Sequence, residues 1–317
     1  MIDEKLLKDQ LPFVLQGCDI PELGECYRGK VRDNYLRNDV RVIITSDRLS
    51  CFDVVVTHLP FKGEILNRLA LYWFRATENI CQNHMIESPD PNVMIVQNCR
   101  VLPVEVVVRR YLAGSAWRAY KAGQTVSGIT LPQGLREYSR LPELLITPST
   151  KAPKGQHDEA ISEKAIIESG LVEEKIWETI RERAFALFRY GEKLAAERGL
   201  LLVDTKYEFG LKDDKLILVD EIHTLDSSRY WVASTYEERV AKGESPEMLD
   251  KEPARQWLLS IGYSGDGTPP HFSEEKRIEL AKHYWSSYER ISGLRFLPTV
   301  GDPSERIKKN VKKYLNL

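Results

Sequence analysis

Two apolar runs in the second half of the chain, residues 200–203 and 216–219, each lead directly into a cluster of charged residues. Between them lie residues 212–215, Lys-Asp-Asp-Lys, which have the composition of a tight turn. Apolar runs joined by so short a polar segment predict a β-hairpin. This hairpin constrains the fold more than any other feature, because it brings the two charged clusters onto paired strands.

The charged residues of the first strand would lie on one face of the hairpin. Side chains alternate between the faces of a strand, so Asp204, Lys206 and Glu208 would point the same way. A core does not hold several unpaired charges, whereas a site for Mg²⁺ and a nucleotide can, because the metal and the phosphates supply partners. Glu208 and Asp220, on adjacent strands, are therefore candidate ligands of one ion. Surface ion pairs with Lys206 are the alternative.

The composition indicates a globular protein without bulk affinity for polyanions. The chain is 42% hydrophobic and 29% charged, and its formal net charge of -2 gives no reason to expect nucleic-acid or membrane binding. No apolar run approaches the roughly 20 residues that span a bilayer, and residues 1–5 lack the layout of a secretory signal. The five scattered cysteines show no metal-site spacing. We expect a cytoplasmic protein with reduced thiols.

The pattern of elements predicts an α+β protein with two lobes. Residues 1–102 would form a β-rich N-terminal lobe, and residues 103–317 a mixed α/β lobe with a helical tail and a cleft between the two. Strands are expected at 40–45, 93–96 and 104–108, and helices at about 64–79, 173–198, 253–261, 273–291 and 303–314. Residues 123–155 are rich in proline and glycine and are expected to be a loop or insertion.

Other polar segments could bind anions. Gly29-Lys30-Val31-Arg32-Asp33 lacks P-loop spacing, yet its Lys and Arg could cover a polyphosphate; an ordinary solvated hairpin is the alternative. Residues 46–53 follow a strand, where sites and plain turns are both common. Arg109 and Ser115, with Gly114 between them, suit a phosphate monoester, or else a surface arginine and a helix cap. The segment 157–159, His-Asp-Glu, does not by itself suggest a metal site.

In their order along the chain, these segments resemble the longer form of the SAICAR synthetases (phosphoribosylaminoimidazole-succinocarboxamide synthases). The resemblance runs from about residue 15 to about residue 260. The ordered set carries it, rather than any one motif. The matching segments are residues 29–33, 46–50, 62–67, 109–117, 147–151, 157–159, 204–210, 220–231 and 251–257.

The resemblance implies an ATP-dependent ligase of de novo purine (IMP) biosynthesis. It would join L-aspartate to the carboxylate of the carboxyaminoimidazole ribonucleotide CAIR, giving SAICAR, ADP and phosphate, with Mg²⁺ as cofactor. The implied fold is two-lobed and ATP-grasp-like or kinase-like. The implied route is phosphorylation of the CAIR carboxylate and attack by the aspartate amine, since an acyl phosphate is a good acyl donor. The expected partners are these small molecules, with no nucleic acid and no membrane, for a monomer or homodimer.

The resemblance also implies roles toward ATP and the metal. Lys30 and Arg32 would meet the phosphates of ATP, and Glu208 and Asp220 would hold Mg²⁺. The residues implied to form the hinge beside adenine are Arg100, Leu102 and Glu105.

The implied catalytic residues are Asp204 and Lys206, with Lys206 close to the reacting carboxylate. Arg109, Ser115 and Arg229 would bind the ribonucleotide phosphate, and Asp226 would line the CAIR site. The remaining residues implied to bind substrate are Lys251, Arg255, Asp47 and Ser50.

Two other functions are compatible with parts of this pattern. One is a different ATP-dependent carboxylate–amine ligase or a small-molecule kinase, and a kinase would need no amine. The other is a catalytically silent nucleotide-binding module, against which the presence of Lys30, Lys206, Glu208 and Asp220 argues.

Overall fold

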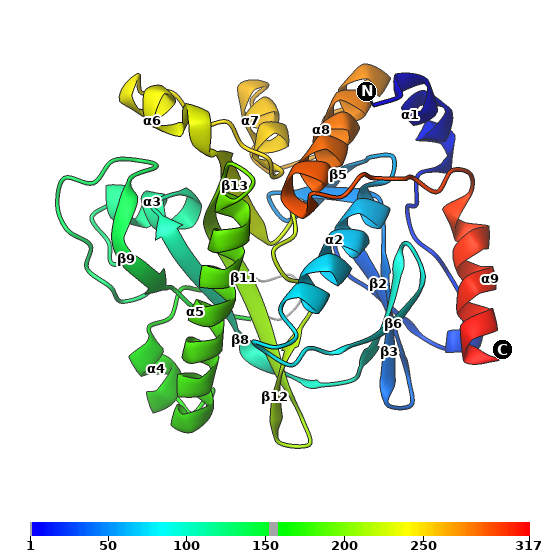
Figure 1. Cartoon of the computed structure of the whole chain (residues 1–317), viewed down its shortest axis with the longest axis horizontal. Helices are drawn as coiled ribbons and strands as arrows, with labels where there is room; N and C mark the ends of the chain where they lie inside the picture. Colours follow the sequence, from blue (N-terminus) through cyan, green and yellow to red (C-terminus); the bar gives the residue numbers. More distant parts are fainter. Residues whose placement is uncertain (1, 152–157) are drawn as a thin grey trace. The chain divides into compact units, whose positions relative to one another are not determined.

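The computed structural model describes residues 2–151 and 158–317 (Figure 1). They form two compact units, each assembled from segments that are separate in the sequence. Unit 1 contains the chain up to Tyr72, His84–Asn98 and Leu249–Leu317; unit 2 contains Trp73–Asn83 and Cys99–Met248. In the described ranges, no helix is both long and apolar enough to cross a membrane.

Unit 1 is built on an antiparallel sheet with the strand order β1-β2-β3-β7-β6. Its strands are Cys26–Arg28 (β1), Arg32–Arg37 (β2), Val40–Thr45 (β3), Met85–Asp90 (β6) and Val93–Gln97 (β7). Val42 and Ile44 alternate along β3 and point into one core, where Ile307 and Val311 of helix α9 (Pro303–Leu315) also lie. The last helix of the chain therefore covers the first sheet.

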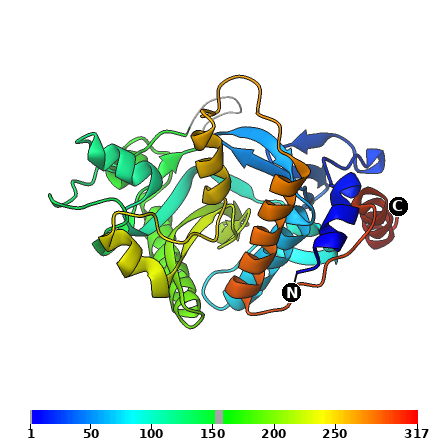
Figure 2. The same ribbon diagram turned by 90° about the horizontal axis from the view of Figure 1, so that it is seen from above.

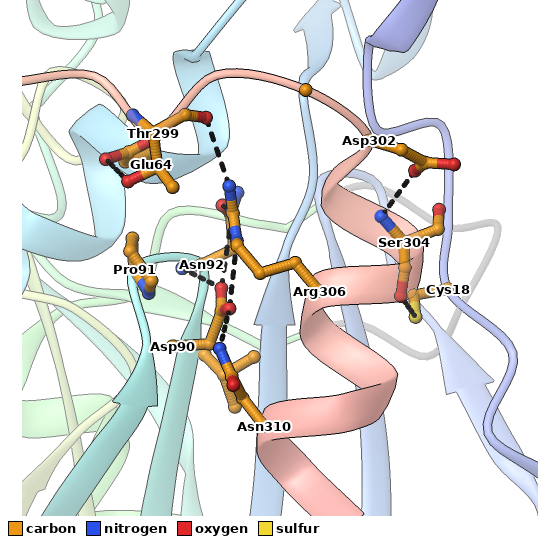
Figure 3. Close-up of polar contacts among 12 residues, drawn as sticks. Cys18, Glu64, Asp90, Pro91, Asn92, Thr299, Asp302, Ser304, Arg306 and Asn310 are labelled. Atoms are coloured by element: carbon orange, nitrogen blue, oxygen red, sulfur yellow. Dashed lines mark hydrogen bonds and ion pairs between the residues drawn. The ribbon is translucent and has the colours of Figure 1, made fainter.

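Polar contacts also fasten α9 to this sheet (Figure 3). Arg306 Nε donates to Asp90 Oδ2 at 3.0 Å, and Asn310 Nδ2 donates to the same oxygen at 2.8 Å. Arg306 also donates to Asn92 Oδ1 at 2.6 Å. Asp90 is only 1% exposed, so these contacts supply the partners that a buried carboxylate requires.

The rest of unit 1 comprises a short hairpin and several helices. Helix α1 lies beside α8 in both views (Figure 1 and Figure 2). The elements are α1 (Glu4–Gln10), η1 (Leu11–Phe13), η2 (Pro21–Leu23), β4 (Arg48–Cys51), β5 (Val54–His58), α7 (Glu252–Ser260) and α8 (Glu274–Ser292). Helix α2 (Lys62–Ala76) begins in unit 1 and ends in unit 2.

Unit 2 is built on a second antiparallel sheet, which carries the long strands β8 and β11 at its centre. The order is β10-β8-β11-β12, with β13 also paired to β11 and β9 to β8. Helix α5 packs along β11 (Figure 1). The elements are β8 (Arg100–Tyr111), α3 (Gly114–Lys121), β9 (Arg140–Ile146), β10 (Ser149–Thr150), α4 (Glu163–Glu168), α5 (Glu174–Ala196), β11 (Leu200–Lys212), β12 (Lys215–Val219), β13 (Ser228–Val232) and α6 (Ala233–Ala241).

The predicted hairpin is confirmed, and it is longer than expected. Strand β11 continues through the charged segment, and Glu208 lies opposite Val219 of β12. The turn residues Asp213 and Asp214 have φ of 49° and 59°, which suits a two-residue hairpin turn. The other predicted strands and helices are present, with ends that differ by a few residues.

The prediction that residues 123–155 form only a loop or insertion is wrong for part of that range. Strand β9 lies within it and pairs with β8 at Val108 and Arg109. Pro142 belongs to this strand. A proline fits there because, among the described residues, β9 pairs with β8 alone, which leaves positions where no amide donor is needed.

The predicted boundary at residue 102 differs from the division into compact units. Residues 249–317 belong to unit 1, although the sequence suggested that they form the tail of the second lobe. The physical reason is that α9 packs on β6 and α8 packs on α1. The expected strand-rich character of the first hundred residues agrees with the structure.

Candidate functional site

One face of β11 in unit 2 carries the charged residues that the sequence singled out. Asp204, Lys206 and Glu208 alternate along the strand, and each meets a charged neighbour on the adjoining strands. In the register of β11 against β8, Asp204 lies opposite Arg109 and Glu208 lies opposite Glu105. The predicted arrangement of these three side chains on a common face agrees with their contacts.

At one end of this face, two guanidinium groups share one carboxylate. Asp204 Oδ2 accepts from Arg109 Nη1 at 2.9 Å and from Arg229 Nη1 at 2.7 Å. Arg109 is 6% exposed, and it also donates to Thr147 Oγ1 at 2.8 Å and to Ser115 Oγ at 3.1 Å. It is thus a buried cation and not the surface arginine of the alternative interpretation. Ser115 lies within the first turn of α3, whose N-cap is Ala113 and not the serine.

Gly114 is what allows Arg229 to occupy this position. Its φ is +57°, and a Cβ added there would lie 2.4 Å from Arg229 Nη2. Any larger residue would both strain the backbone and displace the guanidinium.

Burial lowers the pKa of Arg109, Asp204 raises it, and the neighbouring charge of Arg229 lowers it again. Two cations that share one carboxylate leave a positive charge to which a phosphate can bind.

Further along the same face, Lys206 lies among carboxylates. Its Nζ is 2.5 Å from Glu105 Oε1 and 3.1 Å from Glu208 Oε1, and Lys151 binds the other oxygen of Glu208. Burial by itself would lower the pKa of Lys206, but the charges of Glu208, Glu105 and Asp220 outweigh it and raise that pKa. These carboxylates therefore favour the cationic form of Lys206, which can attract an anion.

Burial raises the pKa of Glu105, although Lys206 opposes the shift. The donors at this end of the face, the carboxylates of Glu105, Glu208 and Asp220, are hard oxygen ligands of the kind that Mg²⁺ prefers. Among the residues that the structure describes, no cluster of three acidic, histidine or cysteine side chains is close enough to hold an ion unaided. Mg²⁺ commonly takes only one or two carboxylates and completes its shell with phosphates and water, so the donor set fits a metal–nucleotide.

Asp220 follows β12 directly and has a φ of +66°. It opens the loop 220–227, which also contains Asp226 and leads into Arg229 on β13. Hydrogen bonds order this loop internally: Thr224 N donates to Ser227 Oγ at 3.0 Å, and Ser228 N donates to Thr224 O at 3.0 Å. A non-glycine residue in the left-handed region is uncommon, although aspartate adopts it more readily than most, and such residues occur at turns as well as at functional sites.

In unit 1, Arg48 holds the glycine-containing segment 29–33. Its guanidinium donates to Lys30 O at 2.9 Å, to Gly29 O at 3.2 Å and to Asp33 Oδ1 at 2.8 Å. Lys30 extends outward and pairs with Asp53 at 2.5 Å, and both side chains are more than half exposed. Lys30 is thus available to an anion, whereas Arg48, which the sequence interpretation left out, is bound to the backbone.

The other predicted substrate residues of unit 1 differ in accessibility. Asp47 is 3% exposed, and its oxygens accept from Leu15 N at 2.7 Å and Gly63 N at 2.8 Å. Burial raises the pKa of Asp47 to about 6, even though the two backbone donors act to lower it. Ser50 is also buried, on β4.

Lys251 and Arg255 lie at the start of α7, where Arg255 Nη1 is 3.4 Å from Glu252 Oε2. Arg32 opens β2 in unit 1, and Arg100 and Leu102 open the continuous strand β8 in unit 2, where a hinge was expected. His157 lies outside the described residues.

Comparison with known proteins assigns this chain to a family. Residues 25–270 match the family model described as SAICAR synthetase. The chain is 43% identical over 304 residues to the phosphoribosylaminoimidazole-succinocarboxamide synthase of Bacteroides thetaiotaomicron, an alignment that covers 94% of this chain and 97% of the relative. The chain belongs to the SAICAR synthetase family.

Solved structures of SAICAR synthetases agree with this assignment. SAICAR-synthase from Saccharomyces cerevisiae, complexed with SAICAR, superposes with a TM-score of 0.79 at 31% identity, covering 90% of this chain and all of that one. A type-2 SAICAR synthetase in complex with ADP gives a TM-score of 0.66 at 26% identity and covers 86% of this chain and all of that one. The family, the α+β fold class and the ligase activity expected from the sequence are thereby confirmed.

Some residues that contact the predicted site residues were not singled out from the sequence. Thr147 and Lys151 lie in segments that carried the resemblance, yet neither was given a role; in the structure they contact Arg109 and Glu208. Their contacts depend on the pairing of β8 with β11, which joins residues about 100 positions apart, and on its pairing with β10, which joins residues about 45 positions apart. A sequence pattern shows which side chains share a strand face, but not which distant strand supplies their partners.

Proposed function

We propose that this protein joins L-aspartate to the carboxylate of CAIR with ATP and Mg²⁺, and that the charged face of β11 divides this task between its two ends. The observation that carries the proposal is the alternation on one strand of Asp204, which gathers two arginines, and Lys206 and Glu208, which lie among carboxylates. One end suits a phosphate and the other suits a metal-bound nucleotide.

The arginine end is the proposed site of the ribonucleotide phosphate. Arg109 and Arg229 present guanidinium groups that are already oriented by Asp204, and Ser115 adds a hydroxyl beside Arg109. A preorganised pair of this kind binds a phosphate without first losing much side-chain freedom. Asp226, in the loop before β13, is proposed to line the same substrate's binding site.

The lysine end is the proposed reaction centre. Glu208 and Asp220 would hold Mg²⁺, which would neutralise the phosphates of ATP. Lys206 would attract the carboxylate of CAIR and the negative charge that develops as it is phosphorylated. Because Lys206 keeps its proton, its proposed role is electrostatic.

We propose roles toward ATP and substrate for residues of unit 1 as well. Lys30 and Arg32 would meet ATP phosphates, and Lys251 and Arg255 would contact substrate. For Asp47 and Ser50 we propose a supporting role, because both are buried and Asp47 already binds two backbone amides. From unit 2, Arg100, Leu102 and Glu105 are proposed to lie beside adenine. A cytoplasmic location accords with five free thiols.

The activity is tested by following ADP release from the purified protein. ADP should appear only when CAIR and L-aspartate are both present, because acyl transfer to the amine completes the cycle. Sustained turnover with CAIR and no dependence on aspartate would indicate a kinase and reject the ligase.

The metal role is tested by Asp220→Asn. Loss of this carboxylate should lower kcat by at least roughly a hundredfold, the order expected when an electrostatic contact to the transition state is removed. Raising the Mg²⁺ concentration should recover part of the loss. An unchanged kcat and an unchanged Mg²⁺ requirement would reject this role for Asp220.

A further inference from the structure

The loop 220–227, which carries Asp220 and Asp226, inserts one side chain into the core of unit 2. This side chain is His223, which is 0% exposed and has a φ of +51°. Its ring lies edge-on to Trp73 with centroids 4.7 Å apart. A Cβ added to Gly191 of α5 would lie 2.3 Å from His223 Cε1, so the helix approaches the ring closely only because residue 191 is glycine.

One hydrogen bond orients this ring. His223 Nε2 lies 2.6 Å from the hydroxyl of Tyr207 on β11, and Tyr207 is also 0% exposed. Tyr207 lies between Lys206 and Glu208 in the sequence, so its side chain points to the opposite face of the strand. The pair therefore supports the charged face from behind and cannot itself contact substrate there.

Burying this polar pair in an apolar core lowers the stability of the folded state. His223 Nδ1 has no hydrogen-bond partner among the described residues. A neutral imidazole and a phenol carry one N–H and one O–H, and a single bond between them satisfies only one of these donors. The other remains buried without an acceptor, which destabilises the folded state. Two apolar side chains of similar shape would avoid this loss of stability.

The pair is also uncharged. Burial lowers the pKa of His223 to about 3 and raises the pKa of Tyr207 well above its usual value, so both groups are neutral near pH 7. A neutral buried pair fixes the orientation of its two side chains, because a hydrogen bond is directional and apolar packing is not. The backbone of the same residue is held as well, since Tyr230 Oη donates to His223 O at 3.0 Å.

We infer that the His223–Tyr207 pair is a positioning device that fixes the loop 220–227, so that Asp220 is held beside Glu208. The inference rests on the proposed role of Asp220 as a metal ligand. His223 lies three residues from Asp220 and three from Asp226, so rotation of its ring out of the core would move both carboxylates. Neither His223 nor Tyr207 contacts substrate in this role.

The decisive variant replaces both partners, Tyr207→Phe with His223→Leu. Removing the pair together leaves no orphaned polar group, so the melting temperature should stay within a few degrees of that of the unmodified protein. The loop should nevertheless loosen. Hydrogen exchange at the amides of Thr224, Asp226 and Ser227 should become at least tenfold faster, and the affinity for ADP in the presence of Mg²⁺, measured by calorimetry, should fall roughly tenfold.

Tyr35→Phe is the matched control. Tyr35 is a buried tyrosine of unit 1 whose hydroxyl donates to Cys18 O at 2.8 Å and accepts from Ile20 N at 3.0 Å. Its loss should lower stability without changing the exchange of the loop or the affinity for Mg²⁺ and ADP. His223→Gln, whose amide can reach the Tyr207 hydroxyl, should restore most of the loop's protection.

Unchanged loop exchange and unchanged Mg²⁺-dependent ADP affinity in the double variant would overturn the inference. Failure of the proposed function gives a different result, because the unmodified protein would then not convert CAIR and aspartate. Hydrogen exchange of the loop still decides the positioning role in that case, since it does not depend on turnover.

Discussion

At the scale of single residues, the site depends on charges that balance one another inside the protein. Asp204 accepts from two arginines, and one of them, Arg109, is buried. Lys206 is balanced by Glu105 and Glu208 in the same way. A buried charge is tolerated only with its partner, so these residues serve stability and binding together.

Asp204→Asn should therefore destabilise the fold as well as impair binding. Arg109 would remain buried without a carboxylate, and breaking a buried pair from one side costs about 3–5 kcal/mol. Urea unfolding measures this loss. Asp19→Asn is the control, because the pair of Asp19 with Arg28 is exposed, and we expect a change below about 1 kcal/mol there. Equal effects of the two substitutions would contradict the assignment of a buried pair.

His223 should make the stability sensitive to acid. Its pKa is about 3 in the folded protein against 6.5 for the free side chain, so the unfolded chain binds a proton first as the pH falls. Its contribution to stability is complete above about pH 6.5 and decreases as the pH falls toward 3. Between pH 7.5 and 5, this one group should cost about 2 kcal/mol of the free energy of unfolding. His223→Leu should remove that part of the pH dependence, and parallel curves for the two proteins would contradict the prediction.

At the scale of elements, two helices and a strand show how distant segments complete each unit. Helix α9 covers the sheet that opens the chain, through Ile307 and Val311 in the core and Arg306 on the buried carboxylate of Asp90 (Figure 3). Helix α5 packs along β11 and admits the His223 ring at Gly191. Strand β8 supplies the arginine and the glutamate that face β11.

Arg306→Met should loosen α9 without unfolding unit 1. Asp90 keeps its bond to Asn310, but it loses the cation that offsets its burial, so we expect a loss of about 2–3 kcal/mol in the free energy of unfolding. Hydrogen exchange in residues 303–315 should rise. Lys309→Met changes the charge on the same helix away from Asp90 and should leave both measurements nearly unchanged. Similar exchange in the two variants would show that the contact of Arg306 with Asp90 does not hold the helix.

Local patterns in the sequence predicted much of the fold and less of the site. The hairpin, the strand at 40–45 and the long helices follow from periodicity and turn chemistry. The sequence did not predict β9, because Pro142 and nearby glycines resemble loop composition until the pairing with β8 is known. It also could not show that Asp47 is buried against two backbone amides, or that Arg109 and Asp204 are opposite each other. Both depend on which strands pair, and many pairings satisfy the same local pattern.

At the scale of the whole molecule, the cysteines provide a test of the core that does not involve the active site. All five are free thiols; Cys18, Cys51 and Cys81 are buried, and Cys26 and Cys99 are partly exposed. Burial raises the pKa of Cys18 to about 12 and that of Cys81 to about 11. Neither Cys18 nor Cys81 is therefore ionised to an appreciable extent near neutral pH, and the thiolate is the reactive form.

Titration of the native protein with a thiol reagent such as dithionitrobenzoate should therefore be biphasic. At most Cys26 and Cys99 should react quickly, and the three buried thiols should react only at the rate at which the protein opens. All five should react at once in denaturant. Rapid reaction of Cys18 or Cys81 in the native protein, located by mass spectrometry of the labelled peptides, would show that the core around them is open.

The ammonium of Lys206, held between two carboxylates, has one more consequence. Burial lowers the pKa of Lys206, but Glu208 and Glu105 raise it and so favour the charged form. In the proposed reaction centre, this ammonium would supply a positive charge whose position is set by the protein's own carboxylates before any substrate binds.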